Sequence, residues 1–328
     1  MVRRYLKKEG DRLLGEILNT YYLQIGSFIL INIMLAISVY VPLSSGQLSL
    51  GSAGFMGVGA YTSALLTLHF DLPIVVGIIA GALVASILGV IVGIPALRLS
   101  GVYLAIATLG LGEVIRVIFV NWDSLTKGSV GLTGIPQLGR EILEFARGLG
   151  FEPSMIGIKN NQFVFLSIFL VLLILVIAIL WFVVRQQNSR VGRALSSINM
   201  DDRAAESMGI NITYYKVVSF TQGAFFAGLA GALFAHVIGF ISPADFAYHR
   251  AVEVLIFTVF GGSEVIVGSV FGAFFLTLMP EVLRFVSEFR YIIYGIILVL
   301  LMAIRPQGII DTNLLKIFKF KRSKGGVR

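Results

Sequence analysis

The sequence predicts an all-α integral membrane protein that crosses the bilayer many times. Of its 328 residues, 57% are hydrophobic and only 13% are charged, whereas an ordinary soluble domain has roughly 25% charged residues. The mean hydropathy is +0.90. Uncharged runs are also long enough to span a membrane. Phe163 to Val184 contains 22 residues without a charge, and an apolar helix needs about 20 residues to cross the hydrocarbon core.

Eight apolar segments are candidates for membrane helices. The last one is short, but Arg290 and Arg305 bracket it, and their long side chains can reach the interface and extend the span. The segments define a transmembrane domain over 21–306, between a basic N-terminus (1–20) and a basic tail (307–328). They are 21–43, 46–68, 72–97, 99–121, 163–184, 217–244, 251–280 and 291–304.

Positive charges are concentrated in three clusters that flank apolar segments. Residues 1–12 carry five Lys or Arg residues, residues 185–216 carry five, and residues 305–328 carry seven. Because Lys and Arg are enriched in cytoplasmic loops, we expect all three clusters, and both termini, to be cytoplasmic. The loop 122–161 carries four basic and four acidic residues, so it is predicted to be extracytoplasmic.

This orientation conflicts with a simple count of the segments. Five segments separate the first two basic clusters and three separate the last two, but clusters on one side require even numbers. At least one segment in each half must therefore be broken. The run Gly261-Gly262-Ser263-Glu264 is the predicted break in 251–280, and the Gly- and Ser-rich residues 44–52 are the predicted break in 46–68. We therefore expect eight to ten membrane helices, some broken or re-entrant.

The broken segments are candidates for a transport pathway. Irregular backbone is tolerated at membrane depth only where protein or a water-filled cavity surrounds it, and discontinuous helices mark substrate sites in transporters. The pathway residues predicted on this basis are Gln47, Ser49, Gly51, Gly261 and Gly262. The alternative is that the glycines only allow helices to pack closely.

Few charged residues lie inside the predicted spans. Glu113 and Arg116 are three residues apart and share one helical face, and we interpret them as a mutually satisfied pair near the interface. Glu253 and Glu264 lie near segment boundaries and are ambiguous. His236 stands alone in an uncharged run and is interpreted as a hydrogen-bonded structural residue. The scarcity of carboxylates in the middle of spans argues against a self-sufficient secondary transporter.

The sequence contains no motif for chemistry. It has no Cys, and its three His residues show neither H-x-x-x-H nor H-E-x-x-H spacing, so no metal site is predicted. P-loop and G-x-S-x-G motifs are also absent from the sequence, and neither an enzyme nor a nucleotide site is predicted. The net charge of +8 comes from residues beside apolar runs, which does not favour nucleic-acid binding. If transport needs ATP, another subunit must bind it.

Residues 185–216 are predicted to contain a short amphipathic helix of about two turns. Asp201 and Asp202 can cap its N-terminus, and Gly209 can end it. The helix is either a solvated connector or a docking element for a cytoplasmic partner.

Several motifs, in order between residues 44 and 285, resemble permease subunits of branched-chain amino acid ABC importers of the LivM type. Residue 52 departs from the pattern, because the family often has His where this chain has Ser52. The matching motifs are GQLSLG (46–51), GVGAYT (57–62), GLTGIP (131–136), GRAL (192–195), AAESMGIN (204–211), FAGLAGAL (226–233), FGG (260–262) and GSVFG (268–272).

The resemblance implies that the short loop helix couples the spans to an ATPase, with Arg193, Ala205, Glu206 and Gly209 as coupling residues. It implies a heterodimer with a second, LivH-like permease, two cytoplasmic ATPase subunits that bind ATP and Mg²⁺, and a periplasmic or lipid-anchored substrate-binding protein. The implied location is the prokaryotic inner membrane, and the implied substrates are leucine, isoleucine and valine. Related permeases carry urea or short amides, which stays open as an alternative.

Overall fold

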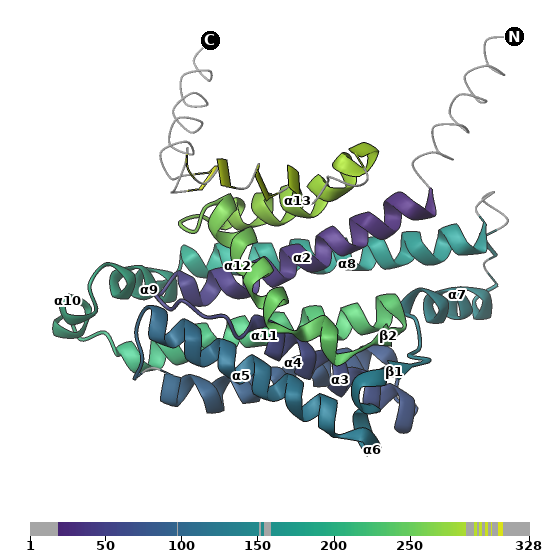
Figure 1. Ribbon diagram of the computed structural model, residues 1–328, viewed down its shortest axis with the longest axis horizontal. Coiled ribbons are helices and arrows are strands. Elements are labelled where there is room, and N and C mark those ends of the chain that lie inside the picture. Colours follow the sequence, from purple (N-terminus) through teal and green to yellow (C-terminus); the bar gives the residue numbers. More distant parts are fainter. Residues whose placement is uncertain are drawn as a thin grey trace, which may run out of the picture.

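The structure is a computed structural model that describes most of the chain between residues 19 and 310 (Figure 1). The predictions for the basic N-terminal cluster, for the basic tail and for most of segment 291–304 fall outside the described residues. The described residues are 19–96, 98–150, 152–153, 159–286, 292–293, 295–296, 299–300, 303 and 308–310.

Helices make up almost all of this part of the chain, which confirms the all-α prediction. The only strands among the described residues form a two-stranded antiparallel ribbon in which Leu132 pairs with Ile241. The α-helices are α2 (Thr20–Leu43), α3 (Ser52–His69), α4 (Ile74–Ala96), α5 (Val102–Asn121), α6 (Asp123–Thr126), α7 (Leu138–Gly148), α8 (Asn160–Gln187), α9 (Arg190–Met200), α10 (Asp202–Ser207), α11 (Ile212–Ile238), α12 (Tyr248–Gly261) and α13 (Ile266–Val282). The 3-10 helices are η1 (Gly128–Val130), η3 (Pro243–Phe246) and η4 (Leu283–Val286), and the strands are β1 (Leu132–Thr133) and β2 (Phe240–Ile241).

Five of the described helices, α2, α4, α5, α8 and α11, are long and apolar enough to cross a membrane. This confirms a multi-pass membrane protein. Figure 1 shows these helices lying along one common direction, with α9 and α10 at one end of the molecule and α7 with the β1–β2 ribbon at the other. We call these the α10 end and the α7 end.

The helix directions follow from residue contacts. α2 and α8 are parallel, since Gly26 approaches Phe169 near their starts and Gln187 Nε2 donates to the Tyr40 hydroxyl at 2.5 Å near their ends. Both run towards the α10 end. α4 runs the same way, and α3, α5 and α11 run back to the α7 end. The antiparallel packing of α4 on α11 shows in the approach of Gly93 to Phe220.

The predicted break in segment 251–280 is confirmed. The segment forms two helices, α12 and α13, joined by a turn at the α10 end. Thr258 Oγ1 donates to the Ala36 carbonyl at 3.2 Å, and Asn32 Nδ2 donates to Thr277 Oγ1 at 2.9 Å. Arg250, near the start of α12, bonds to Asn32, four residues before Ala36, so α12 runs parallel to α2 towards the α10 end. α13 returns antiparallel to α2, since Ile266 at its start bonds to Tyr40.

The predicted irregularity in segment 46–68 is also present, but it does not change the number of crossings. The helix begins only at Ser52, and the preceding residues are not helical. Residues 44–69 nevertheless cross the molecule once. α2 consequently starts at the α7 end, opposite α9 and α10, whereas the charge pattern predicts the N-terminus on the side of 185–216. Residues 1–18 lie outside the described part, so the orientation of that cluster stays a prediction.

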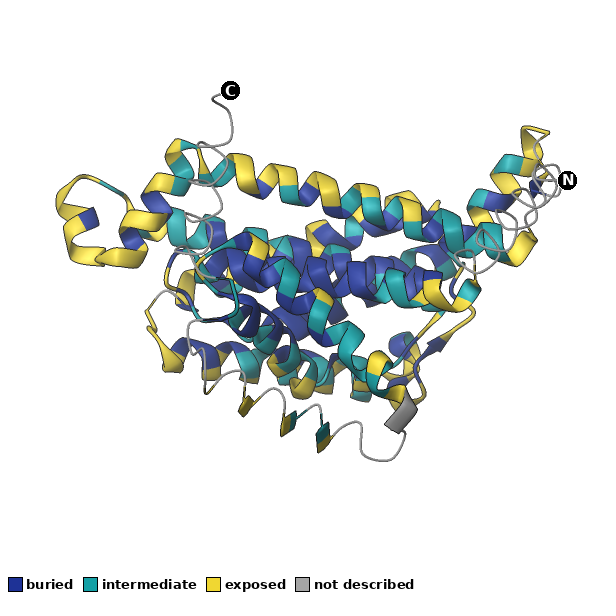
Figure 2. Cartoon of the chain, turned by 90° about the horizontal axis from the view of Figure 1, so that it is seen from above, coloured by how far each residue is buried: buried dark blue, intermediate teal, exposed yellow. Residues whose placement is uncertain are grey.

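The core is formed by α2, α3, α4 and α11. Figure 2 shows the buried residues gathered in the central helices, with exposed residues on the outer ones. Glycines allow the closest approaches: a Cβ on Gly231 of α11 would overlap the Met56 carbonyl of α3, and one on Gly59 would overlap the Gly228 carbonyl. Small residues that let helix backbones touch are a main source of packing energy between membrane helices.

Candidate functional site

The loop at the α10 end contains two helices rather than the single predicted one. α9 is amphipathic and buries Ala194, Leu195 and Ile198. Asp201 caps α10 as predicted, because its Oδ1 accepts from the backbone N–H of Arg203 at 2.8 Å and of Ala204 at 3.0 Å. An ion pair of 2.6 Å between Lys216 Nζ and Asp202 Oδ2 fixes α10 to the start of α11.

The predicted coupling residues lie on both loop helices. Ala205 is buried and Glu206 is exposed, and both belong to α10. Gly209 follows with φ +81°, the left-handed conformation that ends helices and favours glycine. Arg193 lies instead on α9, where its Nη1 donates to the Asn188 carbonyl at 3.3 Å. Three of the four residues thus share one projecting element, and Arg193 lies on the helix that supports it.

Two exposed methionines add a feature that the sequence analysis did not use. Met200 precedes α10 and is 84% exposed, and Met208 follows it and is 83% exposed. Flexible, polarizable Met side chains are common at binding surfaces. The sequence places both methionines directly beside a capped six-residue helix, so this exposed pair could have been predicted from the sequence.

The first group of predicted pathway residues is buried, although Gln47 also lines a cleft of about 520 Å³ between this stretch, the start of α5 and the α9–α10 loop. Gln47 and Ser49 are both buried, and Gln47 Oε1 accepts from Ser45 Oγ at 3.3 Å. The backbone N–H of Leu50 donates to Thr108 Oγ1 at 2.9 Å, which joins this extended stretch to α5. Gly51 immediately precedes α3.

Gly261 and Gly262, the second group, form the turn that ends α12. A Cβ on Gly261 would overlap the Gly268 carbonyl of α13, and the Gly261 carbonyl accepts from the backbone N–H of Ile310 at 3.0 Å. Gly262 adopts φ +125° and is closely approached by Ile310. These contacts fit the alternative interpretation, in which the two glycines only allow helices to pack closely.

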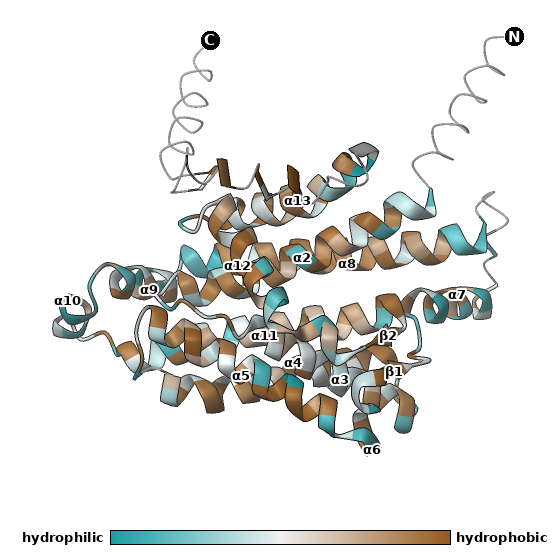
Figure 3. Ribbon diagram, in the orientation of Figure 1, coloured by the Kyte–Doolittle hydropathy of each residue, from teal (hydrophilic) through white to brown (hydrophobic). Residues whose placement is uncertain are grey.

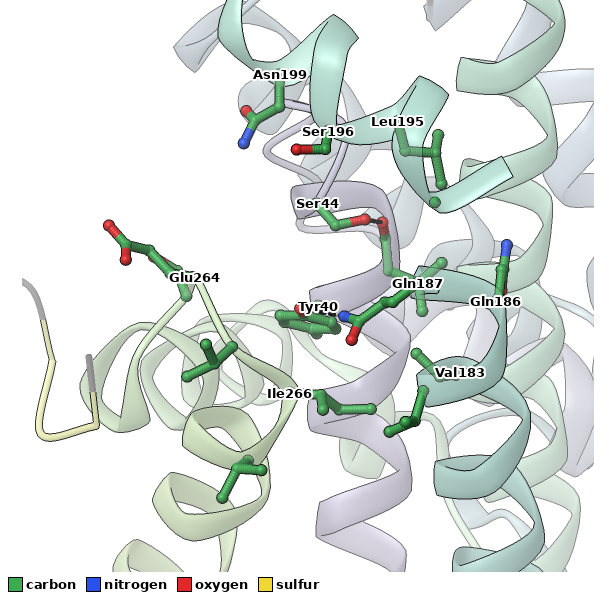
Figure 4. Close-up of a pocket in the computed structure, with 16 residues that line it drawn as sticks. Tyr40, Ser44, Val183, Gln186, Gln187, Leu195, Ser196, Asn199, Glu264 and Ile266 are labelled. Carbon is green, nitrogen blue, oxygen red and sulfur yellow. Dashed lines mark hydrogen bonds between the residues drawn. The ribbon is translucent and has the colours of Figure 1, made fainter. Parts of the chain in front are cut away.

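A cleft of about 520 Å³ lies beside this turn at the α10 end (Figure 4). Figure 4 shows Tyr40 and Gln187 on one wall and Glu264 on the opposite side, with Asn199 of α9 at its rim. Neither Gly261 nor Gln47 lines it. The two groups of predicted pathway residues therefore do not meet in this cavity.

A polar cluster that the sequence did not predict lies in the middle of the apolar body. Glu113 of α5 accepts two hydrogen bonds of 2.7 Å, through Oε2 from Arg116 Nε and through Oε1 from the backbone N–H of Tyr248. Tyr248 is the first residue of α12, so Glu113 supplies negative charge at a helix N-terminus, which is favourable. The pair is mutually satisfied, as predicted, but Glu113 lies near the middle of α5 rather than at its end, and the pair also anchors the start of a half-length helix.

The same cluster extends to α2. Arg250 donates to Glu253 Oε2 through Nη1 and to Asn32 Oδ1 through Nη2, both at 2.6 Å. Asn32 lies 12 residues into the 24-residue α2, about 18 Å from its start at 1.5 Å per residue. Figure 3 shows the hydrophilic residues on α5 and at the beginning of α12 inside an otherwise hydrophobic body. We call Asn32, Glu113, Arg116, Arg250 and Glu253 the mid-membrane cluster.

His236 is fully buried and hydrogen-bonded on both sides, as its interpretation as a structural residue predicts. Its Nδ1 lies 2.8 Å from the Pro136 carbonyl, and its Nε2 lies 2.8 Å from Ser63 Oγ. Since a carbonyl only accepts, Nδ1 carries the proton and Nε2 accepts from the Ser63 hydroxyl. The ring thus joins α3 and α11 to the loop that precedes α7.

Replacing His236 by Phe is expected to lower the thermal stability of the purified chain. The Pro136 carbonyl and the Ser63 hydroxyl lose their partner, and an unsatisfied buried polar group costs about 1–3 kcal/mol. His69, which is exposed, provides the matched control. Melting in detergent should shift down for His236→Phe and not for His69→Phe, and equal melting temperatures would contradict the assigned role.

The comparisons with known proteins agree with this architecture. A family model described as "Branched-chain amino acid transport system / permease component" matches residues 21–302. The high-affinity branched-chain amino acid transport system permease protein LivM of Salmonella typhimurium is 36% identical over 284 residues, which cover 84% of this chain and 66% of the relative. LivM of Escherichia coli K12 is 35% identical, and the alignment again covers 84% of this chain and 66% of the relative.

A more distant relative is the autoinducer 2 import system permease protein LsrC of Escherichia coli O9:H4, 27% identical over 67% of this chain and 58% of that protein. The chain thus spans just under two thirds of the length of the LivM relatives. No solved structure matches it significantly. Because the family model covers nearly all of the described helices, the chain belongs to the family of permease components of branched-chain amino acid transport systems.

Proposed function

We propose that this chain is a membrane-spanning permease subunit of an ATP-driven importer of leucine, isoleucine and valine in the prokaryotic inner membrane. The observation that carries the proposal is the exposed, capped helix α10, which projects from the α10 end on a chain of this permease family. No group of His, Cys, Asp or Glu among the described residues could hold a metal ion, and the role assigned here is transport rather than catalysis.

The α9–α10 loop is the proposed docking element for a cytoplasmic ATPase. Glu206, Met200 and Met208 are exposed there, while Ala205 is buried and anchors α10. The ion pair of Asp202 with Lys216 passes a displacement of α10 to α11, which packs against α2, α3 and α4. ATP and Mg²⁺ would bind to two ATPase subunits, and a LivH-like permease and a periplasmic or lipid-anchored binding protein would complete the importer.

We propose branched-chain amino acids rather than urea or short amides as substrates, because the more similar relatives are branched-chain amino acid permeases. The two LivM proteins named above are more similar to this chain than LsrC, which is named as a permease for autoinducer 2. A soluble binding protein would supply most of the selectivity, so the permease itself needs no deep apolar pocket.

The test is ATP-dependent uptake by the complete complex in proteoliposomes that contain the binding protein. Labelled leucine should accumulate and labelled urea should not, and the chain alone under an ion gradient should transport neither. Glu206→Ala and Gly209→Val should abolish uptake while membrane insertion stays normal. Normal uptake by both variants would refute the coupling role, and flux through the chain alone would favour a secondary transporter.

A further inference from the structure

The mid-membrane cluster has an exposed side that lipid cannot cover favourably. Tyr248 is 59% exposed, the Glu253 side chain is 44% exposed, and His249 is exposed as well. Glu113 and Arg116 are partly exposed beside them. Charged groups in contact with hydrocarbon cost several kcal/mol and normally face a bundle interior or a water-filled cavity. This surface must therefore meet water or protein in the assembled complex.

The backbone of this region supports water rather than lipid. α11 ends at Ile238, and β2, η3 and the start of α12 follow without a membrane-length helix. The Ser242 backbone N–H and hydroxyl donate to Asp245 Oδ2 at 2.8 and 3.1 Å, so a further carboxylate lies in the segment that leads to the cluster. Non-helical backbone at membrane depth requires a protein or aqueous environment.

The charges of the cluster match a zwitterion. Arg116 and Arg250 provide two positive charges, and Glu113 and Glu253 provide two negative charges. Both pairs are already formed within the chain, so a free amino acid, which carries one charge of each sign, meets compensated charges of both signs on this surface. When Arg250 is counted, which bonds to Asn32 behind this surface, the fixed charges of the cluster sum to zero. The surface therefore does not trap a neutral solute by net attraction, and the solute can leave it again.

We propose that Tyr248, His249 and Glu253, beside Glu113 and Arg116, form one wall of a water-filled passage that zwitterionic amino acids contact in transit. The second permease subunit closes the open side of this passage. The inference rests on the proposed importer function. It places the path at the start of α12 and not at Gln47, Ser49 and Gly51, which are buried, or at Gly261 and Gly262, which pack the α12–α13 turn.

Because the sequence contains no Cys, a single Cys needs no background substitutions in this chain, and a complex with the wild-type chain measures any labelling of the other subunits. Tyr248→Cys is compared with Ile87→Cys in the assembled complex. Ile87 is 60% exposed, against 59% for Tyr248, and it lies near the middle of α4. The probe is a charged, membrane-impermeant methanethiosulfonate. His249→Cys is the second test position if the Tyr248 variant does not assemble.

The cysteine at 248 or 249 should react with the probe while the cysteine at 87 does not, since a charged reagent does not enter hydrocarbon. Saturating leucine with the binding protein and ATP should slow the reaction at 248, and urea should leave it unchanged. Loss of reactivity at both test positions would overturn the proposal. Reaction that leucine leaves unchanged would also overturn it, because the surface would then be wet without contacting substrate.

This experiment distinguishes a failure of the proposed importer function from a failure of the proposed passage. Labelling without ATP measures only whether water reaches the surface, so it is independent of transport. If the wild-type complex imports no leucine although position 248 reacts, the importer function is wrong and the wet surface remains. If leucine is imported and position 248 is inert, the function stands and this passage is wrong.

Discussion

Met208→Glu is expected to abolish ATP-driven uptake without preventing insertion of the chain into the membrane. Met208 is 83% exposed next to α10, so the substitution removes little contact inside the chain. If an ATPase cleft buries this side chain, the variant loses about 1.5–3 kcal/mol of apolar burial. It also has to desolvate a carboxylate. At 1.4 kcal/mol per tenfold change, affinity falls roughly 10- to 100-fold or more. Uptake by proteoliposomes and co-purification of the ATPase both measure the effect.

Two controls separate docking from general damage. Met208→Leu keeps an apolar side chain of similar volume and should retain uptake, since such swaps are usually tolerated. Phe145→Glu changes an equally conspicuous exposed apolar residue on α7, at the end away from α10, and should leave ATPase binding intact. Normal co-purification of the ATPase with Met208→Glu would show that α10 does not dock through this residue.

Gly231→Leu is expected to prevent the chain from reaching its native fold. The first carbon of any side chain at Gly231 would overlap the Met56 carbonyl, and that atom belongs to a helix backbone. Overpacking typically costs about 1–3 kcal/mol and more where the neighbours cannot move. α11 would have to separate from α3, so the contacts that Gly59 makes with Gly228 would also be lost. The yield of monodisperse protein in detergent should collapse.

Gly110→Leu is the matched control for this prediction. Gly110 lies inside α5, and a Cβ there meets no atom within 4 Å. The same substitution should therefore leave the yield and melting temperature of the isolated chain near the wild-type values. If both variants fold equally well, the close approach of α3 and α11 is not needed for the fold.

Local signals in the sequence were sufficient to predict several features. The break at Gly261–Glu264 is visible because glycines interrupt an apolar run, and two helices meet there. Asp201 and Gly209 have the residue types that begin and end α10. The end of α11 could also have been predicted, since Gly239 adopts φ +79° and Ser242-Pro243 follows. Apolar residues on both sides concealed it within segment 217–244.

Features that depend on distant contacts could not be predicted in this way. Glu113 bonds to Tyr248, 135 residues later, and Arg250 bonds to Asn32 across 218 residues, so no local window contains the mid-membrane cluster. The number of crossings before the α9–α10 loop could not be predicted for a different reason. Charge counts assume that an irregular segment alters the crossing number, whereas residues 44–51 extend into the body and continue into α3.

The position of Asn32 also has a consequence for biosynthesis. Its side chain is almost completely buried in α2, and its partners Arg250 and Thr277 are encoded 218 and 245 residues later. At about 5–20 residues per second, a ribosome adds Arg250 roughly 10–45 s after Asn32. During that interval α2 is already made but its central amide lacks its final partners. Until the last third of the chain has been synthesised, α2 must therefore lie where water, the insertion machinery or another helix can hydrogen-bond to Asn32.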